Sequence, residues 1–169
     1  MATSAETVVV ITDANILINL LRIGQLPLLG ALDAYRFLVP EEVVGEITDP
    51  AQSEQIASAI ASGYLEQVAV DTMESLALFA ELRDAMGRGE AACLALAATR
   101  GSCLASDEKK RFRRRAVELI GEARILRTEA ILLEAIRQGR ISVAEADEFK
   151  AVLAVNRYSM SFQSFSDLL

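Results

Sequence analysis

The stretch that decides the fold is Val8-Val9-Val10-Ile11-Thr12-Asp13-Ala14-Asn15, in which a run of β-branched residues ends on a carboxylate. Four consecutive apolar residues, three of them valine, are typical of a strand that is buried on both faces, as in a parallel sheet covered by helices. Ligands of such sheets bind beyond the carboxyl ends of the strands, which is where Asp13 would lie. Function then depends on which other side chains reach Asp13.

The rest of the chain alternates strand-like and helical patterns. Short apolar runs predict further strands at residues 35–39, 64–70, 102–106 and 123–126. Helical spacing and helix start and stop residues predict helices at 16–24, from 27 for about one turn, and at 41–47, 51–61, 72–86, 91–100, 107–119, 128–138 and 142–155. This alternation predicts an α/β domain with a short, mostly parallel central sheet.

The length and composition predict one soluble domain. The chain has 169 residues, of which 52% are hydrophobic and 24% are charged, an ordinary balance for a globular protein. We expect a single domain over 1–169, in which the tail, residues 158–169, packs as a helix with Phe162, Phe165 and Leu169 on one side. The longest apolar segment, 8–23, is interrupted by polar and charged side chains, so we expect no membrane segment and a cytoplasmic location.

The absence of histidine limits the catalytic mechanisms that this chain could use. The sequence contains no histidine, which excludes Ser-His-Asp and Cys-His catalysis and every His-based zinc site. The two cysteines, Cys93 and Cys103, have a spacing that matches no metal motif, and we expect both to be reduced core residues. Any catalysis must therefore depend on carboxylates or on a cofactor.

A strongly basic segment follows the fourth expected strand. Residues 109–115 hold six of the 17 cationic side chains and no acid, although the net charge of the chain is −7. Clustered Lys and Arg can bind phosphates whatever the total charge, but such a run is also typical of a solvated helix face. The candidate nucleic-acid-binding residues are Lys109, Lys110, Arg111, Arg113, Arg114 and Arg115.

Four acidic residues occupy positions that a parallel sheet would bring together. Asp13 and Asp107 end strands, Glu90 begins a helix after a glycine loop, and Glu46 lies in an otherwise apolar helical stretch. Each has a simpler explanation on its own. Asp13 and Asp107 could be helix N-caps, Glu90 could offset a helix dipole, and Glu46 could face solvent. Together, the four residues predict an acidic cluster at the carboxyl ends of the strands.

Such a cluster needs a cation or bound protons. Two carboxylates roughly 4 Å apart repel by about 4 kcal/mol at an effective dielectric constant of 20. Mg²⁺ and Mn²⁺ prefer oxygen ligands, and a bound ion can activate water and neutralise a phosphate during an in-line displacement. We therefore expect phosphodiester hydrolysis with Asp13, Glu46, Glu90 and Asp107 as catalytic residues, of which Asp13, Glu90 and Asp107 bind the metal.

Four segments carry these acids in a fixed order along the chain. They are Val10-Ile11-Thr12-Asp13-Ala14-Asn15, Val43-Val44-Gly45-Glu46-Ile47, Gly87-Arg88-Gly89-Glu90-Ala91-Ala92 and Leu104-Ala105-Ser106-Asp107. Over essentially its whole length, the chain resembles the PIN-domain family and, within it, the toxin ribonucleases of VapC-type toxin-antitoxin modules.

The resemblance implies a three-layer α/β/α sandwich, a Mg²⁺ or Mn²⁺ site, and endonucleolytic cleavage of RNA. By position, Asp13, Glu46, Glu90 and Asp107 look like the acidic quartet of the family, and Asn15 matches the small polar residue that supports the first Asp. Many relatives have a second Asp where this chain has Glu108, so we assign Glu108 a supporting role. The resemblance also implies a cognate antitoxin and a homodimer.

Other functions start from the same sequence features. An aspartyl-phosphate enzyme would use Asp13 as its nucleophile, but the haloacid-dehalogenase pattern requires a second Asp where this chain has Asn15. A PIN nuclease in general RNA processing would have the same acids without an antitoxin. A PIN-like fold that only binds its ligand remains open, although all four acids are present.

Overall fold

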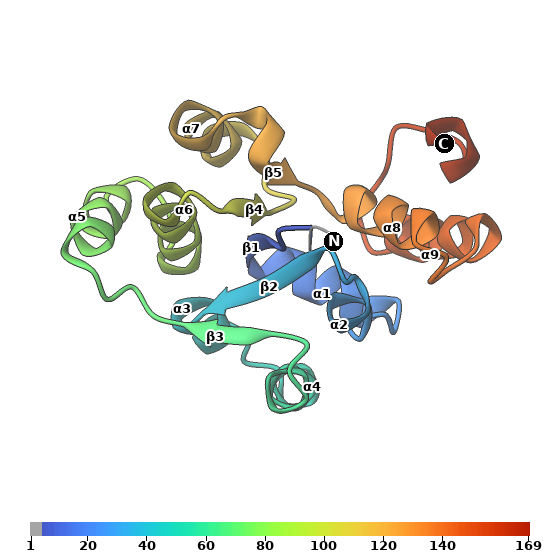
Figure 1. The fold of residues 1–169 in the computed structure, drawn as a ribbon, viewed down its shortest axis with the longest axis horizontal. Helices are drawn as coiled ribbons and strands as arrows, with labels where there is room; N and C mark the ends of the chain where they lie inside the picture. Colours follow the sequence, from blue (N-terminus) through green and yellow to red (C-terminus); the bar gives the residue numbers. More distant parts are fainter. Residues whose placement is uncertain (1–4) are drawn as a thin grey trace.

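The computed structural model describes residues 5–169, which form helices around a five-stranded sheet in the order β3-β2-β1-β4-β5 (Figure 1). All four strand pairings are parallel, which confirms the α/β class predicted from the sequence. The strands are β1 (Val8–Thr12), β2 (Tyr35–Pro40), β3 (Glu66–Val68), β4 (Cys103–Ala105) and β5 (Ile125–Leu126).

Helices cover both faces of the sheet. Helices α5, α6 and α7 lie on one side, whereas α1, α2, α8 and α9 lie on the other (Figure 1). Their bounds are α1 (Ala14–Arg22), α2 (Leu28–Ala31), α3 (Glu41–Glu46), α4 (Pro50–Ala61), α5 (Met73–Leu82), α6 (Arg88–Arg100), α7 (Lys110–Ile120), α8 (Thr128–Arg137) and α9 (Val143–Val155), with 3-10 turns η1 (Glu122–Arg124) and η2 (Phe165–Leu168). Among the described residues, no helix is long and apolar enough to cross a bilayer.

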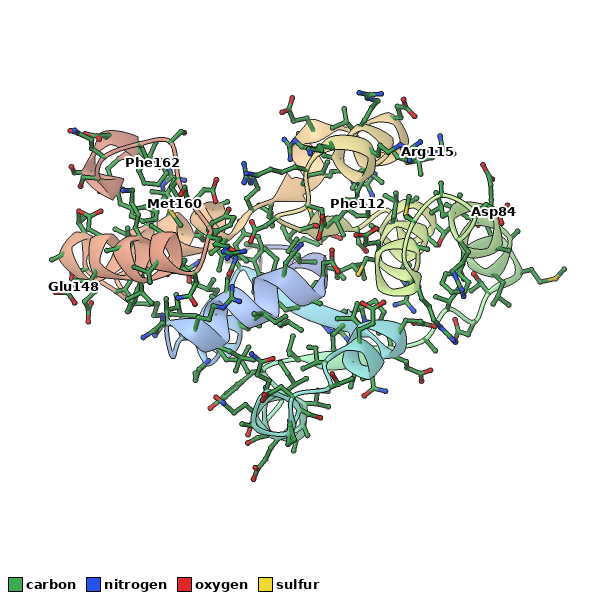
Figure 2. The ribbon with its side chains drawn as sticks, turned by 180° about the vertical axis from the view of Figure 1, so that it is seen from behind. Asp84, Phe112, Arg115, Glu148, Met160 and Phe162 are labelled. Carbon is green, nitrogen blue, oxygen red and sulfur yellow. The ribbon has the colours of Figure 1, made fainter. Side chains whose placement is uncertain are left out.

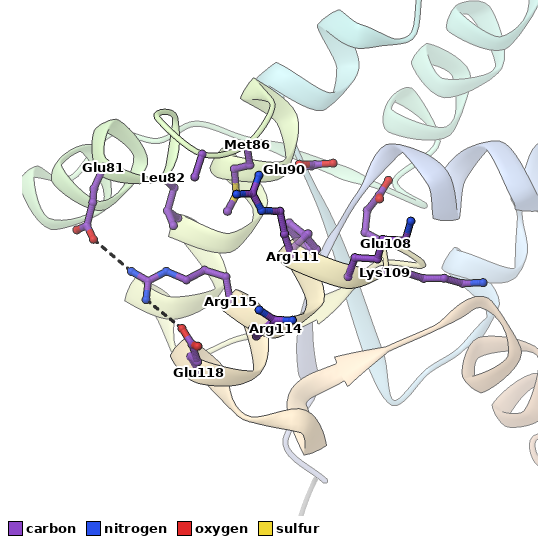
Figure 3. A pocket seen from close by; sticks show the side chains of 13 residues that line it. Glu81, Leu82, Met86, Glu90, Glu108, Lys109, Arg111, Arg114, Arg115 and Glu118 are labelled. Atoms are coloured by element: carbon purple, nitrogen blue, oxygen red, sulfur yellow. Dashed lines mark hydrogen bonds and ion pairs between the residues drawn. The ribbon is translucent and has the colours of Figure 1, made fainter.

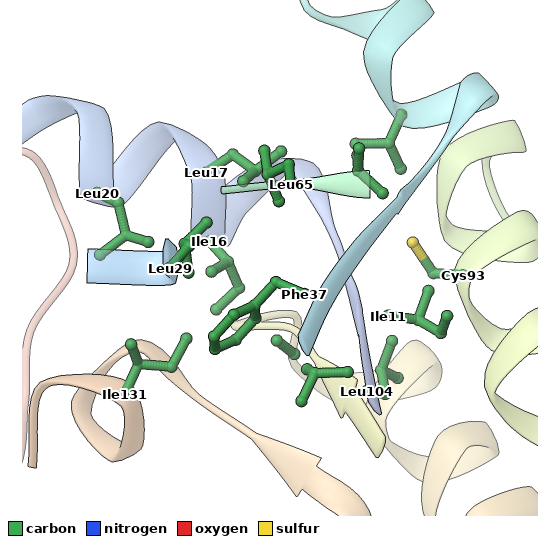
Figure 4. Close-up of a cluster of buried hydrophobic side chains, with 14 of the residues drawn as sticks. Ile11, Ile16, Leu17, Leu20, Leu29, Phe37, Leu65, Cys93, Leu104 and Ile131 are labelled. Atoms are coloured by element: carbon green, nitrogen blue, oxygen red, sulfur yellow. The ribbon is translucent and has the colours of Figure 1, made fainter. Parts of the chain in front are cut away.

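Strand β1 is central because its apolar run is buried on both faces. Val10 pairs with Phe37 of β2 and Cys103 of β4, and Val10 and Ile11 have no exposed surface. Figure 4 shows the surrounding cluster, in which side chains from the sheet and from α1, α2, α6 and α8 meet. This packing fixes the direction of β1 and therefore the position of the carboxylate that follows it.

Successive strands are added first on one side of β1 and then on the other, so the strand order reverses between β1 and β4. Strands β2 and β3 are added on one side of β1, and the chain then returns through α5 and α6 to place β4 on the other side. In α/β sheets the crevice at such a reversal, outside the carboxyl ends of the strands, is where ligands bind. The topology therefore places the crevice next to Asp13.

Several element boundaries differ from the sequence expectations. Helix α5 ends at Leu82 rather than at 86, and β3 covers Glu66–Val68 rather than 64–70. The helix that carries Glu90 begins at Arg88 rather than at 91, and the basic helix begins at Lys110 rather than at 107. The tail contains only the short turn η2 instead of a helix over 158–169. Within the tail Phe165 is fully buried, whereas Leu169 is 63% exposed. Figure 2 shows Phe162 in the loop before this turn, where Lys150 of α9 lies 5.9 Å from its ring centroid.

Candidate active site at the carboxyl ends of β1 and β4

Asp13 lies at the end of β1, inside the crevice. Its Oδ1 accepts a hydrogen bond from the backbone N–H of Ala14 at 2.8 Å, so Asp13 is the N-cap of α1. Its Oδ2 accepts from the Ser106 hydroxyl at 3.0 Å, because the pairing of Thr12 with Ala105 places the residues after β1 and β4 side by side. Only 3% of Asp13 is exposed. Asp13 is therefore a helix N-cap, which was the simpler explanation from the sequence. Its carboxylate nevertheless lies at the carboxyl edge of the sheet.

Glu46 and Glu90 reach this edge from two helices, α3 and α6. The Glu46 Oε1 accepts a hydrogen bond from the backbone N–H of Gly89 at 2.7 Å, in the first turn of α6. A Cβ atom at Gly89 would lie 2.8 Å from the Glu46 Cδ and 2.9 Å from its Oε1. The second glycine of the Gly-x-Gly-Glu segment therefore makes room for the Glu46 carboxylate, one residue before Glu90.

Glu108 joins the cluster from the loop after β4. Its Oε1 accepts a hydrogen bond from the Asn15 Nδ2 at 3.1 Å, while the Asn15 Oδ1 accepts from the backbone N–H of Asp107 at 3.1 Å. Asn15 thus ties the start of α1 to this loop. The backbone N–H of Glu108 donates to the Ser106 hydroxyl at 3.2 Å, and this hydroxyl donates to Asp13, so the Glu108 loop is joined directly to Asp13.

Asp107 points away from that region and into the protein. Its Oδ1 accepts from the Thr128 N–H and lies 2.8 Å from the Tyr158 hydroxyl. Its Oδ2 accepts from the Asn19 Nδ2 at 2.9 Å and from the Thr128 hydroxyl. The N–H and hydroxyl of Thr128 and the Asn19 amide therefore donate to this carboxylate, while the Tyr158 hydroxyl also contacts the Glu129 Oε2 and has one hydrogen for the two acids. Asp107 therefore caps the N-terminus of α8, and the structure does not bring it to the site occupied by Asp13.

Burial and like charge both act on the clustered acids. The pKa of Asp13 is raised to about 7, mainly by burial and also by the charges of Glu108 and Glu90, against hydrogen bonds from Ala14 and Ser106 that lower it. Burial also raises the pKa of Glu90, and repulsion from Glu108 and Glu46 adds to that effect. A cation bound among these side chains would relieve the repulsion.

The donors suit a hard divalent ion, although the side chains do not yet enclose one. All the converging groups are carboxylates, which is the ligand chemistry that Mg²⁺ and Mn²⁺ prefer. Over residues 5–169, no three acidic or cysteine side chains are arranged as a ready metal site. The Ser106 hydroxyl joins Asp13 to the backbone of Glu108, and Glu90 and Glu108 line the same cleft, so we take these three carboxylates as the candidate ligands.

The basic segment divides into paired and unpaired side chains. Arg113 forms an ion pair with Glu122 at 3.0 Å, and Arg115 pairs with Glu81 at 3.2 Å and with Glu118 at 3.3 Å. Within the described chain, the other four cations, Lys109, Lys110, Arg111 and Arg114, form no ion pair and are exposed.

The unpaired cations border a cleft of about 580 Å³ between α5 and α7. Figure 3 shows this cleft, with Arg115 held between its two glutamate partners and Arg111 extending toward the Glu90 end. On the inner side of α7, Phe112 is 6% exposed and packs into the core (Figure 2). Glu90 and Glu108 line the cleft together with the cations, so the acidic cluster and the basic helix share one surface.

Sequence reasoning missed four residues that position the site. They are Ser106, Asn19, Thr128 and Tyr158, through their hydrogen bonds to Asp13 and Asp107. Only Asn19 carried a signal in the sequence, because it lies four residues after Asn15 and so on the same face of a helix. The other three depend on contacts between distant parts of the chain.

Comparison with known proteins gives one family. The family model described as a PIN domain matches residues 9–159, which is most of the chain. The comparison with curated proteins and the comparison with solved structures gave no match.

Proposed function

Because the chain belongs to the PIN-domain family, whose members are generally nucleases and typically use divalent metals, we propose that it is a Mg²⁺- or Mn²⁺-dependent endoribonuclease. The observation that best supports this proposal is the arrangement of Asp13, Glu90 and Glu108 at the carboxyl ends of β1 and β4: Ser106 links Asp13 to Glu108, and Glu90 and Glu108 line a cleft together with unpaired cations. RNA is chosen over DNA because of the sequence resemblance to toxin ribonucleases.

Each acid has a distinct proposed role. Asp13, Glu90 and Glu108 would hold the ion, which when bound would supply an activated water and neutralise charge on the phosphate. Glu46, held against the start of α6 by the Gly89 N–H, would act as the remaining catalytic carboxylate. Asp107 would be a positioning residue instead of a ligand, because both of its oxygens accept hydrogen bonds inside the protein, from Thr128 and Asn19, and it anchors the loop that carries Glu108.

Polar neighbours keep these groups in place. Asp13 accepts one hydrogen bond on each oxygen, from Ala14 and from Ser106, and Glu108 accepts one from Asn15, so both carboxylates keep acceptor positions for an ion. The exposed cations Lys109, Lys110, Arg111 and Arg114 would hold the substrate backbone across the cleft.

The proposal is tested by incubating purified protein with a labelled single-stranded RNA oligonucleotide in Mg²⁺, in Mn²⁺ and in excess chelator. We expect cleavage with either metal and none in chelator. Asp13→Asn, purified in parallel, should be inactive and controls for contaminating nucleases. Equal cleavage in chelator would refute the metal mechanism, and cleavage of only a matched DNA strand would refute the choice of RNA.

A narrower proposal is that this nuclease is the toxin of a toxin-antitoxin pair. It rests on the sequence resemblance alone. The protein would then pair with an antitoxin that covers the acidic site and would act as a homodimer. Induced expression should arrest growth of a bacterial host, expression of Asp13→Asn should not, and co-expression of a small protein encoded next to the gene should restore growth. Normal growth with active wild-type protein would favour general RNA processing.

A further inference from the structure

A second pocket lies on the other side of the loop that carries Glu108. It has a volume of about 410 Å³ and is formed by α1, by residues 107–110 and by the segment that follows α9. We propose that this pocket binds RNA backbone phosphates on the side of the acidic cluster opposite to the α7 cleft. The inference rests on the proposed nuclease function and adds a substrate path to it.

The pocket is cationic, and its cations are not neutralised. Arg22, Lys109, Lys110 and Arg157 line it, all are exposed, and none forms an ion pair anywhere in the described residues. The nearest partner of Arg22 is a neutral one, the Asn19 Oδ1 at 3.4 Å. Four free cations around one hollow favour an anionic ligand with several charges, as in a phosphodiester backbone.

The acids that face this pocket are already engaged. Asp107 is surrounded by its four hydrogen-bond partners, and only 7% of it is exposed. Glu108 is hydrogen bonded to Asn15 and lies at the border with the acidic cluster. Neutral amides, including Asn156, complete the lining. The four cations of this pocket therefore outnumber the two carboxylates in its lining.

The backbone at Arg157 gives an independent reason to look for a ligand here. Helices α1, α4 and α8 each end with a glycine at positive φ two residues after the last helical residue: Gly24, Gly63 and Gly139. Helix α9 ends in the same way, but the residue at that place is Arg157, with φ of 67°. A side chain is unfavourable in this conformation, so the arginine is not explained by the helix end.

Lys110, which also lines this pocket, is a second non-glycine residue with positive φ. It is the first residue of α7 and has φ of 57°. Over residues 5–169, Lys110 and Arg157 are the two non-glycine residues with positive φ, and both line this pocket. Non-glycine residues in the left-handed region persist only where the surrounding structure holds them there, and they concentrate at active and binding sites.

The two pockets are continuous along the Glu108 loop. Glu108, Lys109 and Lys110 line both of them. A single strand of RNA that follows the cations from Arg111 and Arg114 across this loop reaches Arg22 and Arg157, and it passes the acidic cluster on the way. Cleavage would then occur within a strand held on both sides, as an endonuclease requires.

The test is RNA binding by Arg157→Gly, Arg22→Gln and the double variant, measured in chelator so that no cleavage occurs. The probe is a fluorescein-labelled single-stranded RNA oligonucleotide, titrated at several salt concentrations. Each lost phosphate contact lowers the slope of log affinity against log salt by about 0.7, so we expect the double variant to lose about 1.4 and to bind on the order of tenfold more weakly. Arg157→Gly should unfold at the same or a higher temperature than wild type, because glycine suits the left-handed conformation.

The matched control is Arg100→Ala. Arg100 is an exposed cation in the last turn of α6, ten residues and therefore about 15 Å along the helix from Glu90, so its loss should leave binding unchanged. Wild-type affinity and salt slope in the double variant would overturn the inference, while metal-dependent cleavage by wild type would leave the proposed function standing. RNA binding that depends on Arg22 and Arg157 without any cleavage would contradict the nuclease proposal alone. No RNA binding by wild type would overturn both.

Discussion

Asp13 is the buried acid on which the site depends at the scale of single residues. The usual carboxyl pKa of 3.8 rises to about 7 in the fold, mainly because the side chain is buried. Between these values the folded protein keeps a proton that the unfolded chain has lost, so the free energy of unfolding of the metal-free protein falls as pH rises from about 4 to 7. The full effect is about 4 kcal/mol.

Asp13→Asn should remove this pH dependence, because an amide does not ionise. In chelator the variant should be more stable than wild type at pH 8, and the difference should shrink toward pH 4. Thermal unfolding of both proteins at several pH values measures this difference in stability. A variant that is less stable than wild type at every pH would show that the carboxylate is stabilising instead.

Gly89→Ala tests the placement of Glu46. The new Cβ would occupy the position of the Glu46 carboxylate, so we expect the rate of RNA cleavage to fall about tenfold or more. Gly45→Ala is the matched control, because a Cβ at Gly45 meets nothing within 4 Å. It should keep the wild-type rate and gain about 0.5–1 kcal/mol of stability. Equal rates in both variants would contradict a catalytic role for Glu46.

The sequence predicts which acids reach the sheet edge but not all of their orientations. Asp13 and Glu90 could be placed because a strand end and a helix start follow from local patterns. The assignment of Asp107 as a metal ligand stays a prediction that this geometry does not favour, and we propose Glu108 in its place. Whether Asp107 or Glu108 faces Asp13 depends on hydrogen-bond donors far along the chain, such as Tyr158. The sequence around these two acids does not predict such donors.

At the scale of elements, α7 combines a binding surface with intramolecular ion pairs. The sequence predicted a basic helix, but the partners of Arg113 and Arg115 lie partly on other elements, so pairing could not be predicted from the run itself. The helix also begins three residues later than expected, because the Asp107 side chain caps α8 instead of its own helix.

The two pairs of arginines in α7 should respond differently to substitution. Arg111→Gln with Arg114→Gln should weaken RNA binding and lower its salt slope by about 1.4, because these side chains are free to contact phosphates. Arg113→Gln with Arg115→Gln should change affinity little and slightly lower the unfolding temperature. Fluorescence titrations at several salt concentrations measure the RNA affinity and salt slope of both double variants. A larger loss of affinity in the Arg113 and Arg115 variant would contradict the division of α7 into paired and unpaired cations.

At the scale of the whole molecule, Asp107 connects four distant parts of the chain. The loop after β4, α1, α8 and the segment after α9 meet at its carboxylate. The strand alternation in the sequence was sufficient to predict the parallel sheet, whereas this junction depends on side-chain packing between elements. The junction fixes the loop that presents Glu108 to the acidic cluster.

Asp107→Ala should therefore destabilise the fold, while Glu108→Gln should not. Removing the Asp107 carboxylate leaves buried donors unpaired and uncaps α8, for which we expect a loss of about 3 kcal/mol in the free energy of unfolding. Glu108→Gln should stay within about 0.5 kcal/mol of wild type but should lose RNA cleavage. Urea denaturation monitored by circular dichroism measures both values, and equal destabilisation would contradict the structural role of Asp107.

The central claim, that Asp13, Glu90 and Glu108 hold a divalent ion at the sheet reversal, is tested most directly by calorimetric titration of Mn²⁺. The proteins to compare are wild type, Glu108→Gln and Asp107→Asn, each at a temperature where it is folded. We predict that Glu108→Gln binds Mn²⁺ at least about tenfold more weakly than wild type, and that Asp107→Asn binds within about threefold of it. Wild-type affinity in Glu108→Gln together with lost binding in Asp107→Asn would contradict the account.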